Sequence, residues 1–374
     1  MPCAWRSRKM PYFMEQVIEP GEKLIFRNVQ ALRAAAALLV VTVHLANSTG
    51  FEARYLSPTP AVMKLFGTAG FYGVDLFFVI SGFIMTVTTW TLFGNAANSL
   101  TFVLRRITRI YPPYWTVLLP ILLVYLVRPD LVDSHAGTHP NVFASFLLLP
   151  QLGEPLLLVS WSLVFEMAFY AVFAFALCFR RPLLPVILIA WTLGIASASA
   201  HWANSHNPYL RFLANPLPIE FFFGIGVGAL VMSGNVKRPA IALAIGVALV
   251  AILVTLGTLH DDSDYPNLWW RALMGGCGFA CLLYGVVVLE KDRGVTFPRW
   301  LNALGDASYA MYLWHIPVLT VLGLIVVRLH ARSLSAHIVL LAIAFGSVIA
   351  VALFIFRYIE QPQTRALHRR LSLR

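Results

Sequence analysis

Long, uninterrupted apolar runs are the feature that most limits what this chain can fold into. An α-helix needs about 20 apolar residues to cross the hydrocarbon core of a bilayer. Strands of a membrane barrel would instead alternate apolar and polar residues, which these runs do not. The sequence therefore predicts an all-α, polytopic transmembrane bundle of about ten helices. The ten candidate spans lie at about 27–47, 71–93, 113–128, 160–179, 182–200, 216–233, 239–259, 268–289, 309–328 and 335–356.

Composition excludes the main alternative classes. Hydrophobic residues make up 59% of the chain and charged residues only 12%, whereas soluble domains are about 25% charged. A water-soluble globule is therefore excluded. The glycines and prolines fall between the apolar runs and form no biased tract, which excludes collagen-like and disordered chains. The four cysteines show no zinc-binding spacing, and we expect neither a metal site nor a disulfide framework.

The net charge of +11 raises the question of a nucleic-acid partner. With ten spans both termini share one side, and 20 of the 28 Lys and Arg residues fall on that side. Basic residues accumulate on cytoplasmic loops, so we expect both termini in the cytoplasm and no nucleic-acid partner. We accordingly predict a cytoplasmic tail at 1–26, a transmembrane domain at 27–360 and a basic cytoplasmic tail at 361–374. A 26-residue polar lead argues against a signal peptide.

The first predicted span carries two costly polar side chains. A charge at the centre of a span costs about 2.5–3.5 kcal/mol on insertion scales. The presence of Arg33 inside the first span therefore indicates a structural or functional role for its charge. Arg33 and His44 are eleven residues apart, which places them on nearly one helical face and about 16 Å apart along the axis. Gln30 and Asn47 extend the same stripe. Arg33 is expected toward the cytoplasmic half and His44 near the outer end.

Two carboxylates are expected at a similar depth to His44. Asp75 lies near the outer end of the second span, and Glu166 lies one to two turns inside the fourth, with Ser162 and Tyr170 on its helical face. A histidine and two carboxylates can therefore meet near the outer surface. Each also has a structural interpretation, as a helix-end histidine, a solvated aspartate or a glutamate that joins two helices.

Two further groups flank predicted spans. Arg105, Arg106 and Arg109 precede the third span, and clustered guanidinium groups suit phosphate, although they also suit lipid headgroups. In the ninth span Tyr312 and His315 share a face with Ser308. We expect His315 to be structural or part of a lining wall, on the reasoning that its helix enters from the side opposite to His44.

Six of these segments, in this order, resemble the acyltransferase 3 family of bacterial inner-membrane proteins, especially its exopolysaccharide-acetylating branch. Together they cover about residues 25–365. Some members carry an added hydrolase-like domain, and this chain is similar to the standalone form. The matching segments are Asn28 to Arg33 with His44, Gly73 to Phe83, Arg105 to Pro112, Trp161 to Leu163 with Glu166 and Tyr170, Ser308 to His315, and Tyr358 to Pro362.

The resemblance implies transfer of an acyl group, usually acetyl, from cytoplasmic acyl-CoA to a sugar hydroxyl of an exopolysaccharide, an O-antigen or a lipid-linked glycan. His44 would be the general base, with Glu166 or Asp75 orienting its imidazole, and an acyl-histidine intermediate stays open. Arg33 and the three clustered arginines would hold the CoA. Further lining residues are expected to be Gln30, Ser81, Trp161, Ser162, Tyr170, Tyr312 and His315.

The resemblance also implies a location and partners. We expect a multi-pass protein of the bacterial inner membrane, in contact with lipids and with a polysaccharide-assembly machinery. A different class of function stays open from the residues alone: intramembrane Arg, Asp, Glu and His would also serve a proton-coupled transporter or a flippase for a lipid-linked sugar.

Overall fold

The computed structural model describes residues 26–46, 51, 61–132, 139–234, 236–260, 264, 267–329 and 334–371. Most of the predicted N-terminal tail, together with Asn47 and part of the first long loop, lies outside the described residues. Every regular element in these ranges is helical, and no strand occurs in them. The predicted all-α fold is confirmed.

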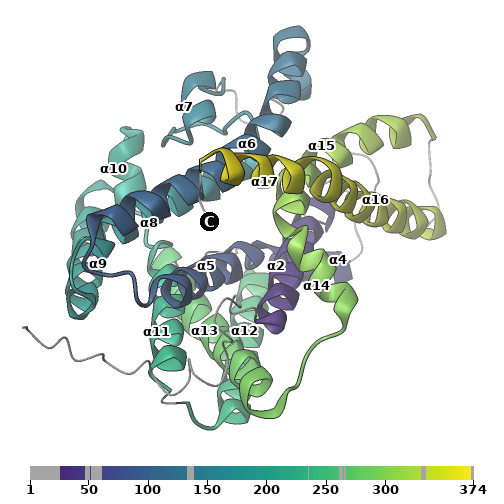
Figure 1. Ribbon diagram of the computed structural model, residues 1–374. Coiled ribbons are helices and arrows are strands. Elements are labelled where there is room, and N and C mark those ends of the chain that lie inside the picture. Colours follow the sequence, from purple (N-terminus) through teal and green to yellow (C-terminus); the bar gives the residue numbers. More distant parts are fainter. Residues whose placement is uncertain are drawn as a thin grey trace, which may run out of the picture.

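Nine helical segments of the described chain are long and apolar enough to cross a membrane. A tenth, α11 (Ile219–Ser233), is apolar but only 15 residues long. The protein is therefore a multi-pass membrane protein, as predicted. The nine segments are built on α2 (Arg27–Ala46), α4 and α5 (Ala61–Phe71, Gly73–Thr89), α6 (Ala96–Val127), α8 (Trp161–Leu177), α9 (Leu184–Trp202), α12 (Pro239–His260), α13 (Leu268–Arg293), α15 (Ser308–Val326) and α16 (Leu334–Ile355) (Figure 1).

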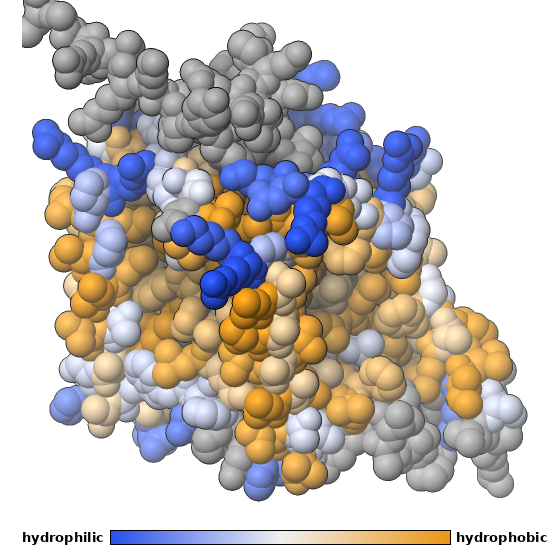
Figure 2. All heavy atoms as spheres, turned by 90° about the horizontal axis from the view of Figure 1, so that it is seen from below, coloured by the Kyte–Doolittle hydropathy of each residue, from blue (hydrophilic) through white to orange (hydrophobic). Residues whose placement is uncertain are grey.

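The remaining α-helices are short and lie at the ends of the bundle or between its spans. They are α7 (Val142–Leu147), α10 (Pro208–Leu213), α14 (Arg299–Asp306) and α17 (Gln361–Arg370). In the space-filling view, hydrophobic residues occupy the middle of the visible face and hydrophilic residues gather mainly along its upper edge (Figure 2). A broad apolar belt of this kind is what a lipid-facing surface requires.

The structure differs from the predicted spans at two places, and at the first the predicted boundary is wrong. The third span was expected to begin at Pro113, but α6 begins at Ala96 and continues through Pro112, Pro113 and Pro120. Proline usually ends a helix in water, whereas neighbouring helices let transmembrane helices continue through it. The arginines at 105–109 therefore lie within a helix and do not precede one.

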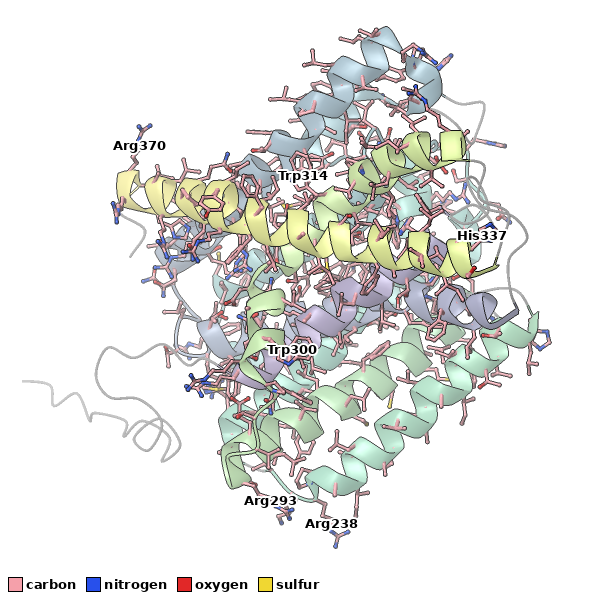
Figure 3. The ribbon with its side chains drawn as sticks, turned by 90° about the vertical axis from the view of Figure 1, so that its right-hand side faces the viewer. Arg238, Arg293, Trp300, Trp314, His337 and Arg370 are labelled. Carbon is pink, nitrogen blue, oxygen red and sulfur yellow. The ribbon has the colours of Figure 1, made fainter. Side chains whose placement is uncertain are left out.

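The second difference is at the C-terminal end. After α16, one π-helical turn over Phe356–Glu360 leads directly into α17. Figure 3 shows the resulting long helix, with His337 near one end and Arg370 at the other. Residues 361–370 are therefore a polar, basic helix that continues directly from the last span.

Glycines allow α5 and α11 to pack with their backbones in contact. A Cβ atom on Gly82 would lie 2.0 Å from the carbonyl oxygen of Phe221, and one on Gly224 would lie 1.9 Å from that of Val79. No larger side chain fits at either position without separating the helices. Small residues commonly permit such close approach in membrane bundles.

Candidate functional site

A polar cavity of about 90 Å³ lies among α2, α5, α6, α8 and α15. It brings together eight residues that the sequence analysis selected from five different helices. We call it the arginine cavity. Those eight lining residues are Arg33, Ser81, Arg106, Arg109, Ser162, Glu166, Tyr170 and Tyr312.

Three guanidinium groups line the arginine cavity. Arg33 donates a hydrogen bond to Gln30 Oε1 (3.0 Å), and Arg106 lies 5.4 and 5.6 Å from the ring centres of Phe102 and Tyr170. Arg106 Nε is buried and has no hydrogen-bond partner. Within the described residues, no carboxylate lies within 4.0 Å of Arg33, Arg106 or Arg109. These cations therefore lack direct ion-pair partners there.

The cavity also holds acidic and phenolic groups. Glu166 accepts hydrogen bonds from Tyr170, one turn along α8, and from Ser81 Oγ (3.2 Å). Asp306, at the end of α14, is close enough to Arg33 and Arg109 to interact with them. Partial burial raises the pKa of Asp306, and the two arginines partly oppose that shift. The hydrogen bonds to Glu166 thus come from neutral donors, while Glu166 and the buried Glu360 interact with the arginines through their charge and without direct contact.

Two histidines meet where α2 and α15 lie side by side. His44 Nδ1 is 3.3 Å from His315 Nε2, and the ring centres are 4.9 Å apart. Each Nδ1 also lies near the carbonyl one turn earlier, at Val40 (3.0 Å) and at Met311 (3.1 Å). A carbonyl oxygen only accepts hydrogen bonds, so each neutral ring carries its proton on Nδ1. His44 Nε2 is then an unprotonated nitrogen.

Tyr312 links the arginine cavity to this histidine pair. Its hydroxyl donates to the Val159 carbonyl (2.6 Å) and shares a hydrogen bond with Ser162 Oγ (2.6 Å). Its ring centre lies 6.0 Å from that of His315. Because Tyr312 also lines the cavity, one side chain contacts both regions. Tyr312 therefore lies between the arginine cavity and the histidine pair.

The structure corrects the expectation for Asp75. Its two carboxylate oxygens accept hydrogen bonds from Arg271, from Nη2 at 2.8 Å and from Nε at 3.1 Å. Asp75 and Arg271 are both buried, and Arg271 also donates to Asp264 (2.7 Å). A shared depth along the membrane does not determine which way a side chain faces. Asp75 is thus engaged by Arg271 and is not the partner of His44.

His315 lies beside His44, contrary to the expectation from its place in the ninth span. Ser308 and Arg33 line the same cavity, while His315 and His44 meet further along their helices. The two helices α2 and α15 therefore run in the same direction, and the assumption that they enter from opposite sides is wrong. His315 contacts the predicted base directly.

Three other predicted residues lie outside the arginine cavity. Gln30 holds Arg33 from the same helix. Arg105 is not one of the cavity-lining residues, although it neighbours Arg106 in sequence. Trp161 lines a separate groove on the other side of α8.

Sequence reasoning missed a buried acidic and basic cluster. Glu220 is fully buried, and neither of its carboxyl oxygens has a hydrogen-bond partner. Asp75 and Glu220 both approach Gly275. A Cβ atom on this glycine would lie 3.3 Å from Asp75 Oδ2 and 3.8 Å from Glu220 Oε1, so the two carboxyl groups lie near the same point. The cost of a charged group inside an apolar run, which singled out Arg33, was also the signal for Glu220 and Arg271.

Comparison with known proteins identifies the family. The model of the acyltransferase domain family (acyltransferase 3) matches residues 26–357. The exopolysaccharide production protein ExoZ of Rhizobium meliloti is 30% identical over 309 residues, covering 80% of this chain and 90% of ExoZ. No solved structure gives a significant match.

Two relatives are named as acetyltransferases. The peptidoglycan O-acetyltransferase OatA of Listeria monocytogenes is 25% identical, covering 90% of this chain and 55% of the relative. The O-acetyltransferase OatA of Staphylococcus aureus is 23% identical, covering 89% and 56%. The chain spans about half the length of these two proteins. Because the family model covers nearly the whole chain, this multi-pass membrane protein belongs to the acyltransferase 3 family.

Proposed function

We propose that the protein is an acyl-CoA-dependent O-acyltransferase that moves an acetyl group to a sugar hydroxyl of an exopolysaccharide or a related glycan. The names of ExoZ and of the two O-acetyltransferases support a polysaccharide acceptor. The proposal includes a bacterial inner-membrane location with cytoplasmic termini, and contact with a polysaccharide-assembly machinery. The positive-inside distribution of charge supports that orientation.

One observation carries the proposal: three guanidinium groups without direct ion-pair partners in the described chain line a cavity, and Tyr312, which also lines it, packs against a pair of histidines. Guanidinium groups bind phosphate through parallel charge-assisted hydrogen bonds. The phosphates of CoA would bind near Arg33, Arg106 and Arg109. The acyl end of the donor would then extend past Tyr312 toward His44.

The histidine pair supports general-base catalysis. His44 Nε2 would take the proton of the acceptor hydroxyl while the hydroxyl oxygen attacks the thioester carbonyl. The carbon–sulfur bond breaks, and the departing thiolate takes the proton from His44. In the two-step alternative, His44 Nε2 itself attacks the thioester and the sugar oxygen then attacks the acyl-histidine.

His315 replaces the carboxylate that we expected beside His44. Its unprotonated Nε2 faces His44 Nδ1 at 3.3 Å, where it accepts a hydrogen bond and favours the Nδ1–H tautomer. When His44 becomes positively charged, this contact and the one to Val40 stabilise the cation. Carboxylates supply the same support in hydrolase triads. His315 is therefore a positioning residue in the proposal.

The test supplies labelled acetyl-CoA to membranes that contain the protein and cell-surface glycans, and measures alkali-labile label on glycan. We expect His44→Ala to lower transfer by about 10²-fold or more and His315→Ala by about tenfold. His201 is a matched control, because its Nδ1 makes the same contact to a carbonyl one turn earlier (Ser197, 2.8 Å) while it lies exposed on α9. His201→Ala should retain transfer within twofold.

Two results would contradict the proposal. Equal transfer by the intact protein and His44→Ala, at equal protein levels, would remove His44 as the base. Absence of label with acetyl-CoA and with other short acyl-CoA donors would instead favour a transporter or flippase. The pH profile separates a positioning role from a structural one. His315→Ala should shift the acidic limb of the profile, where protonation of the base His44 stops the reaction, whereas a protein that is only destabilised would keep its profile.

A further inference from the structure

A second groove lies on the other side of α8. It has a volume of about 210 Å³ and is formed by the segment that follows α7, the beginning of α8 and the short helix α10. Trp161 and Phe165 face this groove, while their neighbours Ser162 and Glu166 line the arginine cavity. One helix therefore separates the two sites, and a chain in the groove lies one helix away from the proposed reaction route. We call this second site the aromatic groove.

Aromatic rings form much of the aromatic groove. The rings of Phe165 and Phe212 stack with centres 4.7 Å apart, and Trp161 meets Phe165 edge-on at 6.1 Å. Trp161 is 36% exposed, so part of its ring is accessible to a ligand. An indole ring offers an apolar face together with a polar N–H group. The apolar faces of sugar rings stack on such surfaces.

Polar groups in the aromatic groove are fixed by the protein and leave donors free. Asn215 Oδ1 accepts a hydrogen bond from Leu217 N (3.0 Å), so its amide nitrogen remains for a ligand. Gln151 is held between Asn141 N (3.1 Å) and Ser145 Oγ (3.3 Å). Side chains that are already ordered lose less conformational entropy when a ligand binds.

Arg211 gives the aromatic groove its charge. It is the one charged residue among those that line this groove, and it is exposed. Within the described part of the chain it forms no ion pair. A guanidinium group provides five donors and no acceptor. The groove therefore combines an aromatic surface with positive charge and free donors.

We propose that the aromatic groove binds an anionic sugar residue of the acceptor glycan, with the ring on Trp161 and the acidic group on Arg211. This inference rests on the proposed function, since it assigns the acceptor to one face of α8 and the donor to the other. A lipid headgroup would match the charge of Arg211, whereas a sugar, with several hydroxyl groups, also matches the fixed amides of Gln151 and Asn215.

The test is a calorimetric titration of the full-length protein in detergent with two probes, a tetramer of galacturonic acid and a neutral tetramer of galactose. We expect the acidic tetramer to bind at least about tenfold more tightly, as a charge-assisted hydrogen bond would provide. Arg211→Gln should abolish this preference, and Trp161→Ala should weaken both probes. Matched controls are Arg328→Gln and Trp202→Ala, which alter an exposed arginine and an exposed tryptophan outside the groove. They should change binding by less than twofold.

Equal binding of the two tetramers, binding of neither, or a preference that survives Arg211→Gln would overturn the inference. Displacement of the acidic tetramer by micelles that contain phosphatidylglycerol, at the ratio expected for a shared site, would also overturn the inference. Label transfer from acetyl-CoA, measured in parallel, separates the two proposals. Transfer without discrimination between tetramers overturns only the groove, whereas discrimination without transfer from any acyl-CoA overturns the proposed function.

Discussion

Two groups of charged residues lie inside the bundle, and the cost of burying their charges is offset differently in each. In the Asp75–Arg271 pair, the guanidinium binds both carboxylate oxygens and a further aspartate. In the arginine cavity, three guanidinium groups have no carboxylate within 4.0 Å among the described residues. A paired charge needs nothing further, whereas unpaired cations in a cavity favour an anionic ligand. The contrast separates charges that stabilise the fold from charges available for binding.

The largest expected effect is the loss of stability when the Asp75–Arg271 pair is broken. Arg271→Gln leaves the carboxylate of Asp75 buried without its cation, and removal of one partner of a buried pair typically costs about 3–5 kcal/mol. Thermal unfolding of the protein in detergent should show the loss. A double variant, Arg271→Met with Asp75→Leu, should recover much of it. Unchanged unfolding of Arg271→Gln would mean that the pair does not stabilise the fold.

Substitutions in the arginine cavity should weaken binding of the donor and leave the stability of the fold unchanged. Arg33→Gln or Arg109→Gln removes charge-assisted hydrogen bonds to the donor, worth about 1.5–3 kcal/mol. The KM for acetyl-CoA should therefore rise about tenfold or more, with unfolding unchanged. Arg105→Gln is the matched control, because Arg105 does not line the cavity, and it should shift KM by less than twofold. An equal rise for Arg105→Gln would indicate a general surface effect.

The smallest expected effect concerns Glu220. Because neither of its buried oxygens has a hydrogen-bond partner, an ionised carboxylate there would cost several kcal/mol. We therefore expect the neutral carboxyl group, and Glu220→Gln, which has nearly the same shape, should change the free energy of unfolding by less than about 0.5 kcal/mol. Glu220→Asp tests packing at the same position. A large destabilisation by Glu220→Gln that Glu220→Asp does not cause would show that Glu220 is ionised and interacts with the positive charge of Arg271.

Much of the fold could be predicted from the sequence because the membrane constrains it strongly. A span must be long, apolar and internally hydrogen-bonded, so apolar runs locate the helices well. The misplaced start of α6 shows the limit of that signal. Pro112 and Pro113 indicate a helix boundary in water, but packing against neighbouring helices keeps the helix intact here.

The site was predicted in part. Spacing along one helix placed Arg33 and His44 on a common face, and eight of the predicted residues meet in the arginine cavity. Contacts between helices depend on the rotation of each helix, which the sequence does not contain. For that reason Asp75, which was offered together with Glu166 as the partner of His44, binds Arg271 instead. The error for His315 has another cause, the assumed direction of its helix, since α15 runs the same way as α2 and brings His315 to His44.

The beginning of α2 is fixed by a carboxylate from α13. Glu290 accepts hydrogen bonds from the backbone N–H groups of Arg27 (2.8 Å) and Asn28 (2.9 Å). This contact sets the axial position of the helix that carries both Arg33 and His44. In the proposed function, α2 would hold the phosphate-binding end and the reacting end of the donor site at a fixed separation. One residue inserted between Arg33 and His44 would rotate His44 by about 100° and move it by about 1.5 Å. The length of this segment would therefore determine which donor can place its acyl group at His44.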